Sequence, residues 1–212
     1  MRPKVSESTV RRLSIYLRRL DDLHRRGVDT VSSQELARGS GATPAQVRKD
    51  LSFFGSFGKR GLGYPVGELR ARVRAILGLE REWQVVVVGA GRIGTALAGY
   101  PAFRAQGFRV VALVDADPAK VGTRAGEVPV RGVDDLGRLV AEEGVEIGII
   151  ATPAEAAQEV ADRLVAAGVR GILNFAPAEL RVPPGVALKT VNMALELESL
   201  SFALTNGVRA RD

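Results

Sequence analysis

A run of four valines, Val85 to Val88, leads directly into Gly89-Ala90-Gly91-Arg92-Ile93-Gly94. A wholly apolar run of this length is typical of a buried parallel strand, here expected over 84–88. Glycines at this spacing after a strand provide a tight turn, room for a pyrophosphate, and close packing of the following helix. The chain is therefore expected to contain a parallel α/β sheet with a dinucleotide-binding turn at 89–94.

A carboxylate at the end of the next expected strand favours NAD(H). Residues 109–114 are largely apolar, and Asp115 follows them, 21 residues after Gly94. A carboxylate in this place binds the ribose hydroxyls of NAD(H) and repels the 2′-phosphate of NADP(H). The alternative is that Asp115 merely caps the Asp-Ala-Asp-Pro turn.

Strand and helix patterns alternate over the rest of the chain, which predicts a doubly wound parallel sheet. Thr152 and Pro153 follow one of these strands at the sheet edge where ligands bind, and we expect them to contact the nicotinamide side. Strands are expected over 128–130, 147–151, 171–175 and 187–191, and helices over 134–143, 154–167 and 193–204.

The same part of the chain lacks the proton donors of hydride-transfer enzymes. After residue 83 there is no histidine and no cysteine, Tyr100 is the only tyrosine, and no Tyr-x-x-x-Lys pattern occurs. Such enzymes need a proton donor or a metal beside the nicotinamide. We therefore expect a protein that binds a nucleotide without being an enzyme, and we predict no catalytic and no metal-binding residue.

The residues before the valine run differ from the rest in charge. Residues 1–82 carry 17 Lys and Arg against 9 Asp and Glu, whereas residues 83–212 carry 13 against 15. This imbalance indicates either a polyanionic partner for the first part or an ordinary solvated basic surface. Arginine pairs recur every seven residues at 11–12, 18–19 and 25–26 on a helix expected over 6–26, where the same two alternatives hold.

Two short helices with capping signatures follow this first helix. Ser32 and Glu35 have capping-box spacing, and Thr43-Pro44 starts a second helix after the Gly39-Ser40-Gly41 turn. Two helices joined in this way make a helix-turn-helix. On the second helix, Val47, Leu51 and Phe54 should pack inward. The outward residues are small or basic, as a major-groove helix requires, although an ordinary amphipathic helix would also fit: they are Ala45, Arg48, Lys49 and Ser52.

The glycine-rich segment 55–64 then predicts a β-hairpin with Lys59 and Arg60 at its tip. A hairpin directly after a recognition helix is a wing, whose cations contact phosphates or the minor groove. With the wing included, the DNA-binding interpretation is favoured. A helix over 68–79 is expected to close this first domain.

The last expected helix, 193–204, is apolar around most of its circumference. Such a helix is either buried in its own domain or docks into a partner subunit, and we favour the partner. No apolar run approaches the length of a membrane span, and the first residues lack the apolar core of a signal peptide, so a soluble cytoplasmic protein is expected.

Nearly the whole chain resembles the Rex family of NADH-sensing bacterial transcriptional repressors. The most specific matches are Thr43–Phe54 with its continuation Gly55–Tyr64, then Val88–Gly94 and Val114–Pro118. The resemblance implies a winged-helix domain over 1–82, a Rossmann domain over 83–191, and a C-terminal helix over 192–212 that is swapped in a homodimer. It also implies a palindromic double-stranded operator, bound when NADH is low relative to NAD⁺ and released when NADH binds.

The resemblance extends to individual residues. It implies DNA contacts for Arg48, Lys49, Lys59 and Arg60, and cofactor contacts for Asp115 and the residues of the glycine turn. It further relates Arg18 and Tyr100 to the nicotinamide and an interdomain switch. Many members carry an Asp at the switch position where this chain has Asn192, followed by Met193. An apolar nicotinamide pocket near Tyr100 and Met193 would disfavour charged NAD⁺, so NADH is expected to bind more tightly.

Two alternatives remain on the sequence alone. One is an NAD(H)-dependent oxidoreductase with an accessory basic domain, which the missing acid–base groups disfavour. The other is a DNA-binding regulator that senses another nucleotide such as coenzyme A, against which Asp115 argues.

Overall fold

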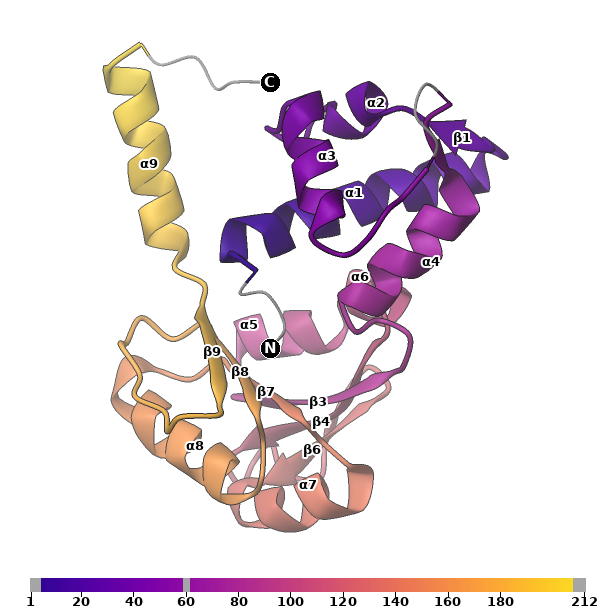
Figure 1. Cartoon of the computed structure of the whole chain (residues 1–212). Helices are drawn as coiled ribbons and strands as arrows, with labels where there is room; N and C mark the ends of the chain where they lie inside the picture. Colours follow the sequence, from indigo (N-terminus) through magenta and orange to yellow (C-terminus); the bar gives the residue numbers. More distant parts are fainter. Residues whose placement is uncertain (1–4, 59–61, 208–212) are drawn as a thin grey trace. The chain divides into compact units, whose positions relative to one another are not determined.

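The computed structural model describes residues 5–58 and 62–207. The chain divides into two compact units, of which the first ends at Arg81 and the second begins at Glu82 (Figure 1). Each unit has its own apolar core. Within the described ranges, no helix is long and apolar enough to cross a membrane.

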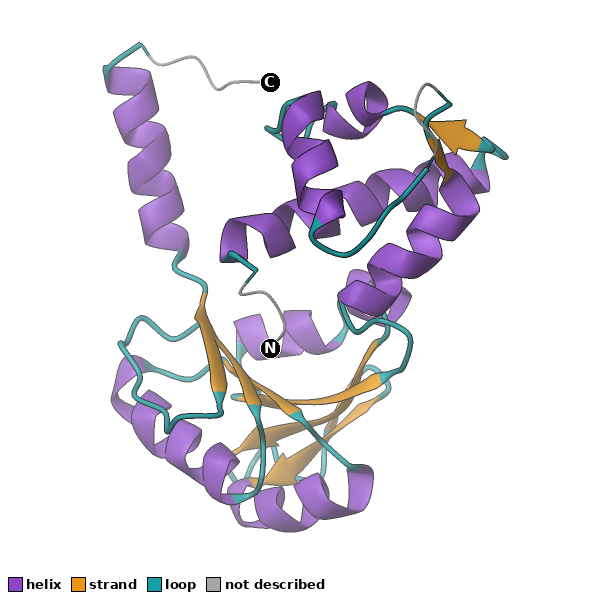
Figure 2. Ribbon diagram, in the orientation of Figure 1, coloured by secondary structure: helices purple, strands orange, loops and turns teal. Residues whose placement is uncertain are grey.

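The first unit is mainly helical (Figure 2). Its core is built largely from one face of the first helix, where Leu13, Tyr16 and Leu20 are fully buried. Leu36, Val47 and Leu69 from the other three helices complete this core. In chain order, the elements are α1 (Glu7–Arg25), β1 (Thr30–Val31), α2 (Ser33–Ala37), α3 (Pro44–Ser52), β2 (Tyr64–Pro65) and α4 (Val66–Ile76).

The capping signatures start α2 and α3 where the sequence predicts. Ser32 Oγ accepts a hydrogen bond from the Glu35 backbone N–H at 3.1 Å, and the Glu35 carboxylate accepts one from the Ser32 N–H at 3.0 Å. Thr43 Oγ1 accepts from the Gln46 N–H at 3.1 Å, with Pro44 in the first turn. These bonds satisfy backbone donors that a helix start leaves free, and they confirm the predicted capping residues.

The predicted hairpin within 55–64 is described only in part, so it stays a prediction. Within this segment, Gly63 forms a single β-bridge and Tyr64 begins β2, which pairs antiparallel with β1. Gly55 and Gly58 have positive φ angles of 130° and 73°, which interrupt a regular strand. Lys59 and Arg60, expected at the tip, lie outside the described residues.

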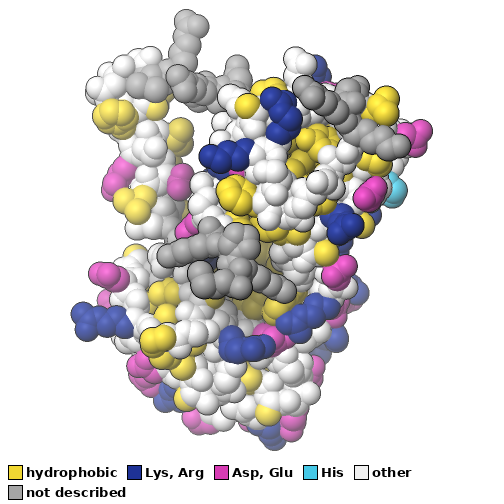
Figure 3. Space-filling model, in the orientation of Figure 1, with side chains coloured by type: hydrophobic (Ala, Val, Ile, Leu, Met, Phe, Trp, Pro, Cys, Tyr) yellow, Lys and Arg dark blue, Asp and Glu magenta, His cyan; other side chains and the backbone are white. Residues whose placement is uncertain are grey.

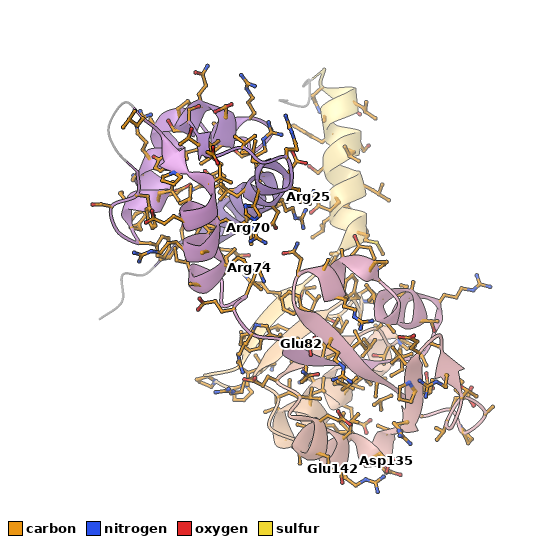
Figure 4. All side chains as sticks on the ribbon, turned by 90° about the vertical axis from the view of Figure 1, so that its right-hand side faces the viewer. Arg25, Arg70, Arg74, Glu82, Asp135 and Glu142 are labelled. Atoms are coloured by element: carbon orange, nitrogen blue, oxygen red, sulfur yellow. The ribbon has the colours of Figure 1, made fainter. Side chains whose placement is uncertain are left out.

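Helix α4 begins at Val66, two residues earlier than expected, because Pro65 ends β2 and occupies the N-cap position. An ion pair links α4 to α1, where Arg70 Nε donates to Asp21 Oδ1 at 2.5 Å. Arg74, one turn further along α4, donates to the carbonyl oxygen of Leu79 at 2.7 Å. Figure 4 labels both arginines.

The second unit contains a seven-stranded sheet in its described part, in the order β5-β6-β4-β3-β7-β8-β9. All neighbours pair in parallel except β5 and β6. From β6 to β9 this is the strand order of dinucleotide-binding folds, with the switch of direction between β3 and β7. The strands are β3 (Trp83–Val88), β4 (Phe108–Asp115), β5 (Arg124–Ala125), β6 (Val128–Gly132), β7 (Ile147–Ile150), β8 (Gly171–Asn174) and β9 (Ala187–Thr190).

Helices cover both faces of this sheet (Figure 1). Val86 and Val88 of β3 pack on the side of α7 (Leu136–Glu143) and α8 (Ala154–Ala166). The alternate residues, Val85 and Val87, pack on the side of α5 (Arg92–Ala98) and α6 (Pro101–Ala105). The doubly wound prediction is confirmed, and both faces of β3 are buried as an apolar run requires.

Two short elements of the second unit are absent from the sequence prediction. Strand β5 has two residues and α6 has five, and neither length yields a periodic apolar pattern. The helix expected over 134–143 begins with a 3₁₀ turn, η1 (Val133–Asp135), before α7. The sheet and the positions of the loops at its ligand-binding edge are unaffected.

Helix α9 (Met193–Thr205) follows β9 and exposes its apolar side chains (Figure 3). The six large ones are between 58% and 85% exposed, and their spacing places them on two opposite sides of the helix. Of the two alternatives for this helix, burial in its own domain is therefore wrong for the described chain. The exposed residues are Met193, Leu195, Leu197, Leu200, Phe202 and Leu204.

Candidate functional site

The glycine turn joins β3 to α5 at the switch point of the sheet. Gly89 has φ of 106°, and a Cβ on it would lie 2.5 Å from the carbonyl oxygen of Ala151 at the end of β7. A Cβ on Gly94 would overlap the carbonyl oxygen of Gly89. Gly91 is the N-cap of α5 and faces open space. At Gly89 and Gly94 the turn therefore has no room for a side chain, whereas at Gly91 it is open, and a pyrophosphate would approach there.

Asp115 is tied directly to this turn. Its Oδ2 accepts a hydrogen bond from the Ala90 backbone N–H at 2.7 Å and one from Lys120 Nζ at 3.2 Å. Its Oδ1 accepts from the Asp117 N–H at 2.9 Å, so Asp115 also caps the following turn. The structure therefore shows the capping contact, and the ribose contact of Asp115 stays a prediction.

These contacts keep Asp115 ionised. Burial alone raises the pKa of its carboxyl group, but the hydrogen bonds from Asp117, Ala90 and Lys120 outweigh burial and lower the pKa below its ordinary value. Lys120 is a participant that sequence reasoning missed. Its spacing of five residues from Asp115, across the Asp-Ala-Asp-Pro turn, is the signal that points to it.

Thr152 and Pro153 lie beside the glycine turn, after β7. Thr152 Oγ1 is buried and has no hydrogen-bond partner within the described chain. A buried hydroxyl without a partner costs free energy that a ligand atom could recover. Together with open Gly91 and ionised Asp115, this hydroxyl fits a dinucleotide bound along the carboxyl edge of the sheet. Pro153 is exposed and precedes α8 as its N-cap.

The remaining candidate cofactor and switch residues are exposed. Tyr100 is 52% exposed and packs edge-on against Phe103, with ring centroids 5.3 Å apart. Asn192 Oδ1 accepts hydrogen bonds from the Ala194 and Leu195 N–H groups, so this side chain is the N-cap of α9. The others that are exposed are Arg92, Ile93 and Met193 in the second unit and Arg18 in the first.

The candidate DNA-reading face lies on α3, in the first unit. As predicted, Val47 and Leu51 are buried, and the four candidate residues on the opposite side are exposed. Arg48 Nη1 donates to Ser33 Oγ of α2 at 3.0 Å, and Ser52 Oγ donates to the carbonyl oxygen of Lys49 at 2.8 Å. Arg48 is thus held by one hydrogen bond that DNA binding could exchange.

A further polar residue of α3, which sequence reasoning missed, points inward. Asp50 is fully buried and accepts hydrogen bonds from Arg12, Tyr16 and Gln46. The signal in the sequence is its position at the edge of the apolar arc of the helix, beside Val47. No group of acidic and histidine residues that could hold a metal ion occurs in the part of the chain that the structure describes.

The fold and the site define a class: a regulator that joins a helix-turn-helix domain to a dinucleotide-binding domain. Two family models match these parts separately. One is described as "Putative DNA-binding protein N-terminus" and matches residues 4–52, and the other as "CoA binding domain" and matches residues 80–178.

Relatives over the full length are more specific. A redox-sensing transcriptional repressor Rex from Carboxydothermus hydrogenoformans is 52% identical over 94% of this chain and 96% of its own. The Rex protein from Streptomyces coelicolor is 51% identical over 93% of this chain and 77% of its own. The chain therefore belongs to the Rex family of redox-sensing transcriptional repressors. This membership confirms that the chain is a transcriptional regulator rather than an enzyme.

Solved structures agree with this assignment. The Rex-family repressor RSP in complex with NAD⁺ and operator DNA superposes with a TM-score of 0.89, at 37% identity, over 97% of this chain and 99% of that one. The same protein in complex with NADH gives a TM-score of 0.86 at 36% identity, over 96% of each chain.

Proposed function

We propose that this chain is a repressor that binds operator DNA when NADH is scarce relative to NAD⁺ and leaves the DNA when NADH binds. The observation that carries this proposal is the hydrogen-bonded unit of Asp115 and the glycine turn in a chain that also presents Arg48 and Lys49 on an exposed helix-turn-helix. NADH and DNA then favour different arrangements of the protein, so each weakens the other through one coupling free energy. A coupling of about 3 kcal/mol corresponds to a change of about 150-fold in operator affinity.

We assign the cofactor to residues along the carboxyl edge of the sheet. Gly89–Gly94 would take the pyrophosphate, Asp115 the adenosine ribose, and Thr152 with Pro153 the nicotinamide side. Tyr100 and Met193 would provide apolar surface near the nicotinamide, where a neutral reduced ring is favoured over a cationic one. Arg18 and Asn192 are proposed to act in the switch, in which Asn192 lacks the charge of an aspartate.

We assign DNA binding to residues 1–82. Ala45, Arg48, Lys49 and Ser52 would meet the major groove, and Lys59 and Arg60 would contact phosphates or the minor groove. Exposure of the four α3 residues supports the first assignment. Replacing Arg48 or Lys49 with Ala should abolish operator binding and leave NADH affinity unchanged.

We further propose a homodimer that binds a palindromic site through two copies of α3. Residues 83–191 would hold the cofactor, and residues 192–212 would form the dimer contact as a swapped helix. The exposed apolar surface of α9 supports this, because each buried leucine contributes about 1.5–3 kcal/mol.

Sedimentation analysis tests the dimer. The variant Leu200→Glu with Phe202→Glu should sediment as a monomer, whereas the matched control Glu196→Gln with Glu198→Gln on the same helix should remain a dimer. If the double-glutamate variant still sediments as a dimer, α9 does not form the dimer interface.

One titration separates this function from its alternatives. The wild-type protein is bound to a duplex that it has itself selected from a random-sequence library, and NADH, NAD⁺, NADPH and coenzyme A are added in turn. We expect release by NADH at far lower concentrations than by the other three. Release by coenzyme A alone would favour the alternative in which the regulator senses a nucleotide other than NADH. Equal affinities for NADH and NAD⁺ by calorimetry would contradict redox sensing.

A further inference from the structure

The buried carboxylate of Asp50 joins two helices of the first unit. Arg12 of α1 donates to it twice, from Nε to Oδ2 at 2.6 Å and from Nη2 to Oδ1 at 2.7 Å. The Tyr16 hydroxyl, also on α1, donates to Oδ2 at 3.0 Å, and Gln46 Nε2 of α3 donates to Oδ1 at 2.8 Å. Four donors thus surround a carboxylate that has no exposed surface.

The environment keeps this group charged. Burial raises the pKa of Asp50, but the hydrogen bonds from Arg12, Gln46 and Tyr16 outweigh burial and lower the pKa below its ordinary value. For Tyr16, burial is the largest cause of a raised pKa, so its hydroxyl stays protonated and donates. The network is therefore fully hydrogen-bonded in one protonation state.

Stability alone is a weak reason for such a network. Replacing a buried ion pair with apolar residues of similar volume is often neutral or stabilising, because desolvation offsets the attraction between the charges. The surrounding core is already apolar, with Leu13, Leu17, Val47 and Leu51 all at most 2% exposed. Hydrophobic contact is non-directional, so the apolar core does not by itself fix the orientation of α3.

Direction matters for α3 because the same helix carries the candidate DNA-reading face. The backbone of α3 lies close to α2 and only sparsely approaches α1, so Arg12 and Tyr16 of α1 reach Asp50 of α3 with long side chains. Among apolar helix pairs of different proteins, crossing angles scatter by about 15–20° around the preferred values, so apolar packing alone does not define one angle. A turn of that size moves a side-chain end about 5–6 Å from the helix axis by roughly 2 Å. Lengths of N–H···O hydrogen bonds vary over only about 0.5 Å, so a displacement of this size breaks such a bond.

We propose that Arg12, Tyr16, Gln46 and Asp50 form an orientation lock, whose function is to fix α3 so that Arg48 and Lys49 meet defined bases. The four are positioning residues for sequence discrimination. The lock rests on the proposed DNA-binding function, and it adds the claim that discrimination between DNA sequences depends on buried groups that never touch DNA.

The test uses the full-length protein and two DNA probes. One is the duplex that the wild type selects from a random-sequence library, and the other is a scrambled duplex of the same length and composition. The variant that combines Arg12→Met, Tyr16→Phe and Asp50→Leu replaces the buried pair, and the hydroxyl bonded to it, by apolar side chains without changing the net charge. The matched control, Arg70→Met with Asp21→Leu, removes an inter-helix ion pair of the same unit whose two residues belong to α4 and α1.

We expect the ratio of selected-duplex to scrambled-duplex affinity to fall at least tenfold in the lock variant. Its affinity for the scrambled duplex, its Tm and its NADH affinity should stay close to those of the wild type. The control variant should keep the wild-type ratio. A purely structural role would lower the Tm or both DNA affinities together, without a specific change in the ratio.

Two milder variants keep the proposal testable if the lock variant does not fold. Tyr16→Phe and Gln46→Met each remove one donor without stranding a buried charge, and each should lower the ratio at least threefold. An unchanged ratio in a folded lock variant, or in both mild variants, overturns the lock while leaving DNA binding intact. A wild type that selects no sequence at all would instead overturn the proposed function, and the lock with it.

Discussion

Replacing Asp115 with asparagine removes one charge from the proposed cofactor site and changes little else in shape. The carboxylate accepts hydrogen bonds at 2.7, 2.9 and 3.2 Å from Ala90, Asp117 and Lys120, and its pKa is lowered, so it is ionised at neutral pH. In the bound state it would exchange part of this set for the ribose hydroxyls. A hydrogen bond to a charged group contributes about 1.5–3 kcal/mol, against about 0.5–1.5 kcal/mol for a neutral one.

The difference sets the expected loss. Substitution should cost about 1–2 kcal/mol of binding free energy for one such bond, which corresponds to about 5–30-fold in Kd. The loss should be the same for NADH and NAD⁺, because both carry the same adenosine. The amide that replaces the carboxylate is neutral and no longer repels a phosphate, so discrimination against NADPH should weaken.

Calorimetric titration of Asp115→Asn with NADH, NAD⁺ and NADPH measures these three effects. The matched control is Asp117→Asn, an exposed carboxylate two residues further along the same turn. Operator affinity of the cofactor-free protein should be unchanged in both variants. An NADH affinity for Asp115→Asn within twofold of the wild type would refute the placing of the ribose at Asp115.

Two further predictions concern single positions. Gly89→Ala should abolish NADH binding and destabilise the protein by about 1–3 kcal/mol in thermal unfolding, because its Cβ would lie 2.5 Å from the Ala151 carbonyl oxygen. Gly91→Ala should weaken NADH binding at an unchanged Tm, because no atom lies within 4 Å of its Cβ. Equal losses of Tm in the two variants would contradict this reasoning. The pKa of Asp50 is lowered in the folded state, so its charge stabilises the fold above the unfolded pKa of about 3.9, and this contribution is lost as the pH falls through the folded pKa. Asp50→Asn should therefore lower the Tm at pH 7, and the Tm of the variant should fall less steeply than that of the wild type below pH 4. An equally steep fall of the Tm in the variant would show that protonation of Asp50 does not cause the acid destabilisation.

Local signals predicted much of the fold. Capping residues such as Ser32 and Thr43 act on their own helix within three residues, so their hydrogen bonds follow from sequence spacing. The same holds for the valine run and the glycine turn, whose geometry depends on adjacent residues. The doubly wound order then follows from the alternation of elements, because parallel strands require crossover connections.

Features that depend on distant partners were not predictable in this way. Arg12 and Asp50 are separated by 38 residues, and neither residue shows in its own neighbourhood that the other will be buried against it. Strand β2 likewise takes its partner from Thr30–Val31, more than thirty residues earlier, and nothing in the local pattern of either segment indicates this pairing. In both places a tertiary contact decided between local alternatives of similar plausibility.

The two ends of the proposed cofactor site differ in a way that bears on redox sensing. At the adenosine end, Asp115 accepts three hydrogen bonds from within the chain, and the turn beside it is closely packed. At the other end, the buried Thr152 hydroxyl has no partner among the described residues. NADH and NAD⁺ differ only in the nicotinamide ring, so the preformed adenosine end contributes equally to the affinity of both. Any preference for NADH must therefore arise at the nicotinamide ring, beside which we propose Thr152, Tyr100 and Met193, because a charge on the ring changes the free energy of binding.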